Sequence, residues 1–357
     1  ITHAFSWHWL FLINVVPGVI SAAAGAVLLP RSPPSWREAK SLDFVALALL
    51  AGTLAALEIA LKESPSLGWA SPFVLGLFGL SAIGAAGFTI RVLRRDRPIV
   101  NLRALSDPRF AVACCLSFVL GIGLFGSVYM MPVFLALVRG HEALAIGQIM
   151  LVTGLAQLVA APVAVFLEKR MDARILAAAG FLLFAIGLAM SAHETPATDF
   201  AEMFWPQIVR GAAVMFCLLP PTRLALGHLP LEKIPDASGL FNLMRNLGGA
   251  IGIALVDTVI FGRAPLHAAA IADQLRSGNI DTAIAAGIPV QAYLAARDAP
   301  ISAAAEALAR PLVERLALSE AINDAWLLIA AITAAATLSL LFIARVRTQF
   351  VAASTTL

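Results

Sequence analysis

Long apolar stretches separated by short polar segments recur along most of the chain. A helix needs about 20 apolar residues to cross a membrane, and the strand-like alternation of apolar and polar positions is absent. The predicted spans are nine: Leu10–Leu29, Leu42–Leu61, Pro72–Leu93, Phe110–Val138, Ala143–Leu167, Ile175–Ala192, Met203–Leu226, Ala237–Phe261 and Ala325–Ala344. The pattern therefore predicts an all-α protein, a polytopic membrane helix bundle.

The basic residues between these spans are distributed unequally. Seventeen Lys and Arg residues fall in segments on one side of the bundle, whereas the short loops on the other side hold only Lys62 and Arg139. Because cytoplasmic loops carry the excess of Lys and Arg, the first span should start outside and the C-terminus should be cytoplasmic.

The composition narrows the class of protein further. Apolar residues make up 60% of the 357 residues and charged residues 13%, against about 25% in soluble domains. An ordinary soluble enzyme and a disordered chain are thereby excluded, and the net charge of +3 indicates no nucleic-acid partner. The first apolar stretch follows almost directly on Ile1, so we expect an N-terminally truncated chain.

One connection differs from the others. Arg263–Glu320 is long, rich in alanine and of mixed charge, which predicts helices over Ala268–Arg276 and Ser302–Leu318. In the second helix, Ala305, Leu308, Leu312 and Leu316 recur at near-helical spacing and form an apolar stripe. Two alternatives remain open: a passive exported hairpin, or an element on which a partner docks.

Five segments together resemble a known family. They are Trp7–Gly18, Arg97–Leu102, Trp205–Gly211, Leu229–Pro230 and Ala237–Gly249. The set is similar to the fourteen-helix drug:proton antiporters of the major facilitator superfamily, the EmrB/QacA type, in which a Trp-rich signature of this kind opens the sixth helix. The resemblance identifies the nine spans with helices six to fourteen.

The resemblance implies a domain organisation. Residues 1–30 would hold the last helix of the N-terminal half, and residues 31–108 a linker with an extra helix pair. Residues 109–347 would form the C-terminal six-helix half of a major facilitator fold, with a periplasmic loop at 263–320, and residues 348–357 a cytoplasmic tail.

The resemblance also implies a function, which is secondary active transport. Drugs or other amphipathic compounds would be exported across the bacterial inner membrane in exchange for protons, without a cofactor. The EmrB branch adds a periplasmic adaptor and an outer-membrane channel as partners. Two alternatives remain: a facilitator-type transporter for an anionic or siderophore-like substrate, and a membrane fragment that does not transport.

Ionisable and amide side chains inside the spans are the first site candidates, because such groups are rare in membranes and usually functional. Arg210 and Gln207 lie three residues apart on one helix face, and Asp257 lies at a similar depth on the next span. An Arg210–Asp257 pair, a cavity lined by both, and separate snorkelling to the outer interface are all compatible with the sequence.

The other candidates are one more amide side chain, two aromatic residues and three glycines. Gln157 would line a cavity or bond a neighbouring helix, and Phe125 and Tyr129 would offer aromatic surface to a substrate or simply pack. Gly248, Gly249 and Gly252 form a small-residue stripe suited to close helix packing.

A further motif lies in a predicted cytoplasmic loop. Asp172 and Arg174 resemble the core of the family's loop motif, although a glycine expected upstream is Val165. The alternative is a plain basic loop. The His, Cys and acidic residues show no catalytic or metal-ligating spacing, so we expect neither an enzyme nor a metal site.

Overall fold

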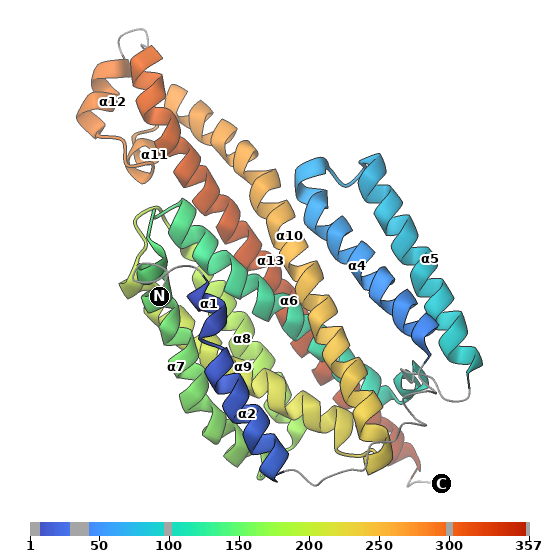
Figure 1. Cartoon of the computed structure of the whole chain (residues 1–357). Coiled ribbons are helices and arrows are strands. Elements are labelled where there is room, and N and C mark those ends of the chain that lie inside the picture. Colours follow the sequence, from blue (N-terminus) through green and yellow to red (C-terminus); the bar gives the residue numbers. More distant parts are fainter. Residues whose placement is uncertain (1–7, 29–42, 96–101, 298–302, 355–357) are drawn as a thin grey trace. The chain divides into compact units, whose positions relative to one another are not determined.

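The computed structural model describes residues 8–28, 43–95, 102–297 and 303–354, which form helices joined by turns (Figure 1). Eight of the described helices are long and apolar enough to cross a membrane. They include α4 (Phe44–Leu67), α5 (Pro72–Arg94), α6 (Pro108–Leu137), α7 (Ala143–Glu168), α8 (Ala173–Met190), α9 (Phe200–Leu226), α10 (Ile234–Arg276) and α13 (Ala303–Ser354). The predicted all-α polytopic class is therefore confirmed.

Shorter helices connect or flank these eight. They are α1 (Trp9–Leu12), α2 (Val15–Leu28), α11 (Ile280–Ala285) and α12 (Val290–Arg297), with 3-10 turns η1 (Leu102–Ser106), η2 (Ser191–His193) and η3 (Leu231–Lys233). The chain divides into two compact units, Ile1–Phe44 and Val45–Leu357.

The first predicted span, Leu10–Leu29, is not one continuous helix in its described part. It consists of α1 and α2, and the longer of the two has only 14 residues. The break falls at Ile13 and Asn14, four and three residues before Pro17. Proline has no backbone N–H, so Pro17 cannot donate to the Ile13 carbonyl and the helix restarts after this point.

The pair α4 and α5 forms a helical hairpin. Its turn contains Gly68 with φ of 89°, a left-handed conformation that favours glycine. Ser81 in α5 donates a hydrogen bond to the carbonyl of Thr53 in α4 at 3.1 Å. Further along the hairpin, Phe88 packs in a small cluster with Ala46. The two helices α4 and α5 thus pack against each other.

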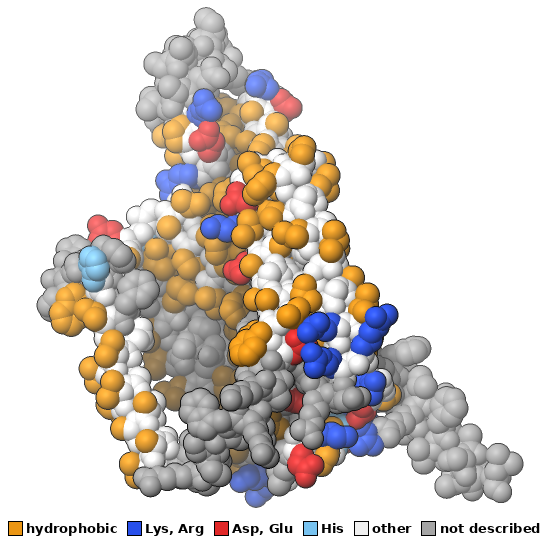
Figure 2. Space-filling model, turned by 45° about the vertical axis from the view of Figure 1, so that its right-hand side comes forward, with side chains coloured by type: hydrophobic (Ala, Val, Ile, Leu, Met, Phe, Trp, Pro, Cys, Tyr) orange, Lys and Arg blue, Asp and Glu red, His pale blue; other side chains and the backbone are white. Residues whose placement is uncertain are grey.

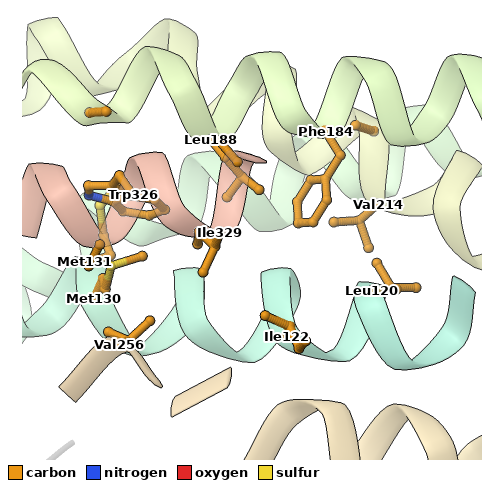
Figure 3. Close-up of a cluster of buried hydrophobic side chains, with 14 of the residues drawn as sticks. Leu120, Ile122, Met130, Met131, Phe184, Leu188, Val214, Val256, Trp326 and Ile329 are labelled. Carbon is orange, nitrogen blue, oxygen red and sulfur yellow. The ribbon is translucent and has the colours of Figure 1, made fainter. Parts of the chain in front are cut away.

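The six helices α6 to α10 and α13 share one buried core. Figure 3 shows Met130 and Met131 lying beside Trp326, and Leu188, Phe184 and Ile329 meeting between their helices. Hydrophobic side chains also cover much of the visible outer surface, and charged side chains gather toward the ends (Figure 2). An apolar exterior between charged ends suits a bundle that is solvated by lipid.

The segment Arg263–Glu320 is not a loop between two helix ends, as the domain prediction had it. α10 runs for 43 residues through to Arg276, and α13 runs for 52 residues from Ala303. Both expected helical stretches are thus parts of longer helices that lie side by side (Figure 1). The apolar stretches end where charged residues begin, but an alanine-rich helix needs no apolar surroundings to continue.

The described part of this segment, residues 263–297 and 303–320, is called the outer extension below and has its own small core. Leu316 from the predicted stripe packs with Ile271 of α10 and with Ala286 after α11. Leu316, at the end of the stripe, therefore packs against its own partner helix.

Candidate functional site

The helix α9 carries two buried polar side chains, Gln207 and Arg210. Its start is set by Asp199, whose side chain forms a capping box with Glu202. A capping box satisfies backbone N–H groups that have no partner in the first helical turn. Gln207 and Arg210 follow about two and three turns into the helix. They are 0% and 4% exposed, so both point into the six-helix unit.

Gln207 is only half satisfied. Thr153 of α7 donates to its Oε1 at 3.0 Å, whereas its buried Nε2 has no partner among the described residues. Gln157 lies one turn further along α7, is half-buried and bonds to no other described residue. A buried amide without an acceptor is costly, so this position is suited to accept a ligand or a water molecule.

Arg210 lies among side chains from η2, from the turn after it and from α13. Its Nη1 donates to Ser191 Oγ at 3.4 Å, and its Cζ lies 4.9 Å from the centre of the Trp326 ring. The buried carboxylate of Glu194 attracts it electrostatically. Glu194 was not among the residues predicted for the site, because a single acidic residue in a short connection has no distinguishing pattern.

Asp257 lies elsewhere, on α10 against α6. Its carboxylate interacts with Tyr129, and its Oδ1 is buried without a hydrogen-bond partner in the described part of the chain. Phe125 lies one turn before Tyr129 and covers Gly249 of α10. Two aromatic rings and a carboxylate thus share one face of the α6–α10 contact.

The six candidates therefore do not form one site. Gln207 with Gln157, Arg210, and Asp257 with Tyr129 and Phe125 fall in three places. No ion pair or hydrogen bond between described residues joins Arg210 to Asp257, so the hypothesis of a direct pair is wrong. Arg210 points toward α13, whereas Asp257 points toward α6. A similar depth in the membrane, which is all that the sequence indicates, does not reveal these directions.

The three glycines of α10 lie against α6. A Cβ added at Gly252 would lie 2.7 Å from the Cα of Ile122, and one at Gly248 would meet the carbonyl oxygen of Phe118. The two backbones touch only because these positions have no side chain.

Asp172 has a local structural role. It is the N-cap of α8, and its side chain accepts a hydrogen bond from the backbone N–H of Arg174 at 2.8 Å. The spacing that resembles the family's loop motif is thus also the spacing of a helix cap.

The connection between α6 and α7 is joined to the connection before α9 by charged side chains. Arg139 bonds Asp199 at 2.6 Å, and His141 bonds the other oxygen of the same carboxylate at 3.1 Å. The hydrogen bond from Arg139 lowers the pKa of Asp199 to about 2. Within the described ranges, no group of three or more His, Cys, Asp or Glu residues is placed to hold a metal ion.

Comparisons with known proteins give a consistent family assignment. The family described as the Major Facilitator Superfamily matches residues 1–253. The chain is 35% identical to the colistin resistance protein EmrB of Acinetobacter baumannii, over 78% of this chain and 55% of that relative. It is 29% identical to the multidrug export protein EmrB of Escherichia coli K12, again over 78% and 55%.

A third relative carries a different substrate in its name. The fatty acid resistance protein FarB of Neisseria gonorrhoeae is 27% identical over 75% of this chain and 53% of its own length. The chain thus spans about half the length of the curated relatives that it matches.

Proposed function

The chain belongs to the Major Facilitator Superfamily, and on that premise we propose that it serves proton-coupled export of amphipathic compounds, cationic ones above all. The names of its relatives, two of which are a colistin resistance protein and a multidrug export protein, support drugs as the substrate class. As the chain spans about half of these relatives, the function proposed is that of the whole transporter.

The observation that carries this proposal is the aromatic and acidic face between α6 and α10. Asp257 sits in an apolar helix, and one of its oxygens is buried without a hydrogen-bond partner among the described residues. Tyr129 interacts with it, and Phe125 lies on the same helix contact, against Gly249. An intramembrane carboxylate is expensive unless it binds a proton or a cation. Aromatic rings next to it supply the apolar and cation-binding surface that an amphipathic cation needs.

The geometry favours a cationic substrate over an anionic one. An anionic or siderophore-like substrate would use Arg210, but that side chain is buried against Trp326 and near Glu194. Its guanidinium is therefore enclosed by protein side chains and not presented to a substrate. The FarB relative nevertheless makes a fatty acid the appropriate anionic compound to test.

Replacing Asp257 by asparagine is expected to reduce proton-driven efflux of ethidium on the order of tenfold, the effect of losing about 1.4 kcal/mol. The amide keeps the shape of the carboxylate but neither binds a proton nor attracts a cation. Efflux is measured in inverted membrane vesicles from cells that express the native gene, energised by a proton gradient.

The matched control is Asp273→Asn, on the same helix but in the outer extension, where Asp273 pairs with Arg276 at the surface. It should transport like the wild type. Unchanged efflux in Asp257→Asn would remove Asp257 from the site. Transport of a fatty acid but not of ethidium would favour the anionic alternative, and transport of neither would favour a non-transporting membrane protein.

We further propose the bacterial inner membrane as the location, with the C-terminus in the cytoplasm. The support is the unequal distribution of Lys and Arg between the two sides. In this orientation, the turn after α4 and the outer extension lie outside, and the turn between α7 and α8 lies in the cytoplasm.

Cysteine labelling is expected to confirm this orientation. In a background without the three native cysteines, Ser66→Cys should react with a membrane-impermeant maleimide in intact cells. Met171→Cys, at an exposed position between α7 and α8, should react only after permeabilisation. The opposite result would invert the topology.

The outer extension is the proposed contact for a periplasmic adaptor, through which an outer-membrane channel would be reached. Beyond the resemblance to the EmrB branch, the support is its exposed apolar side chains, Leu266 on α10, Ile284 on α11 and Leu294 on α12. Packed helices that leave apolar side chains in water are suited to a protein partner.

A further inference from the structure

Glu194 is a buried carboxylate held in place by one face of α13. Its backbone oxygen accepts hydrogen bonds from Ser319 Oγ at 2.8 Å and Asn323 Nδ2 at 2.7 Å, and its backbone N–H donates to Asn323 Oδ1 at 3.0 Å. The residue is 6% exposed. Its position is therefore set by contacts to the main chain, which do not depend on the charge of its side chain.

The carboxylate itself is poorly compensated. Among the described residues, it receives one side-chain hydrogen bond, from Trp326 Nε1 to Oε2 at 3.3 Å. A buried ionised carboxylate needs several strong donors or an ion pair to offset its lost hydration. Burial accordingly raises the pKa of Glu194 to about 8, against the opposing effects of Trp326 and the positive charge of Arg210.

Arg210 is close but not bonded to this carboxylate. No ion pair with an N–O distance of 4.0 Å or less joins the two. Arg210 instead lies over the ring of Trp326 and makes a long hydrogen bond to Ser191. Both contacts are weak compared with an ion pair in a buried site. This is the position that the guanidinium should take if the carboxyl group beside it is neutral.

The other charged groups around Glu194 are engaged or point away. His193 is exposed, and Asp199 is bonded to Arg139 and His141. On α13, Glu320 pairs with His267 of α10. Arg210 is the charged side chain that acts on the Glu194 carboxylate.

From this geometry, we propose that Glu194 is a proton-binding residue whose protonation state decides the position of Arg210. With Glu194 protonated, Arg210 stays over Trp326 and against Ser191. With Glu194 ionised, Arg210 moves off the ring and forms an ion pair with the carboxylate. Proton binding would thereby change how α9 contacts α13 and the turn after η2.

The indole of Trp326 reports on both states, because it carries Arg210 on its face and Glu194 on its Nε1. The test uses the full chain in detergent with the other five tryptophans replaced by phenylalanine, and follows Trp326 fluorescence as the pH is raised. The emission should change in one transition with a midpoint near pH 8, where Glu194 loses its proton.

Glu194→Gln keeps the size of the side chain and cannot ionise, so the transition should disappear. Arg210→Gln removes the counter-charge, so the midpoint should rise by roughly 1 unit. Glu320→Gln, on the same helix as Trp326 but paired with His267, should leave the transition unchanged.

A transition that persists in Glu194→Gln, or no transition in the parent chain, would overturn the proposal. If the five replacements unfold the chain, the same comparison is made between the chain with all six tryptophans and its Glu194→Gln variant. The readout needs no transport, so it is independent of whether the export proposal holds.

Discussion

Replacing Gly248 by leucine is expected to prevent α6 and α10 from packing and to remove most of the correctly folded protein. A Cβ at this position meets the carbonyl oxygen of Phe118 and lies 2.8 Å from its carbonyl carbon. These are backbone atoms, which cannot move aside as a flexible side chain can. Overpacking of a core typically costs about 1–3 kcal/mol, and a backbone collision should reach or exceed the upper end. The yield of monodisperse protein in detergent and its unfolding temperature measure the effect.

Gly262→Leu is the matched control, since it makes the same substitution in the same helix. A Cβ at Gly262 meets nothing within 4 Å. The control should therefore fold with a yield and unfolding temperature close to those of the parent chain. Equal losses in both variants would show that leucine disturbs α10 itself and not its contact with α6.

Replacing Trp326 by alanine is the second change with a large expected effect. Trp326 is a fully buried side chain in the shared core, beside Met130 and Met131 (Figure 3). Removing a buried tryptophan or phenylalanine costs about 3–5 kcal/mol in soluble proteins, because the cavity left behind does not close. The substitution also removes the hydrogen bond that Trp326 donates to Glu194 and the aromatic ring over which Arg210 lies.

The control is Trp205→Ala, because Trp205 is 64% exposed on α9. Its unfolding temperature should fall far less than that of Trp326→Ala in the same detergent. Trp326→Phe should lie between the parent and the alanine variant, since it refills the cavity but does not donate to Glu194. A similar loss for Trp205→Ala would mean that exposure does not determine the effect.

Much of the helix pattern follows from local sequence. The apolar stretches Pro72–Leu93 and Ala143–Leu167 match α5 and α7 within two residues at each end. The predicted helices Ala268–Arg276 and Ser302–Leu318 fall in α10 and α13, apart from Ser302, which lies outside the described residues. The pattern did not predict that these stretches continue the membrane helices without a break. Hydropathy marks where a helix leaves lipid and not where it ends.

The candidate site was predicted less well. Gln207 and Arg210 lie within one turn of α9, but Gln207 bonds Thr153 of α7 whereas Arg210 lies on Trp326 of α13. Asp257 was one candidate partner of Arg210, and the structure instead has Glu194 near it. The position of a residue along its helix can be predicted from the sequence. The neighbouring helix that its side chain faces cannot.

The apolar stretches alone are enough to predict a bundle of membrane helices, and the five quoted segments add the resemblance to the major facilitator superfamily. In lipid every backbone N–H and C=O must be paired within the protein, so a long apolar stretch has almost no other choice than a helix. The burial of Glu194 and the place of Asp257 beside Tyr129, in contrast, follow from tertiary packing. These contacts join residues far apart along the chain, and they depend on how each helix is rotated against its neighbours, which is set by the packing of all of them together.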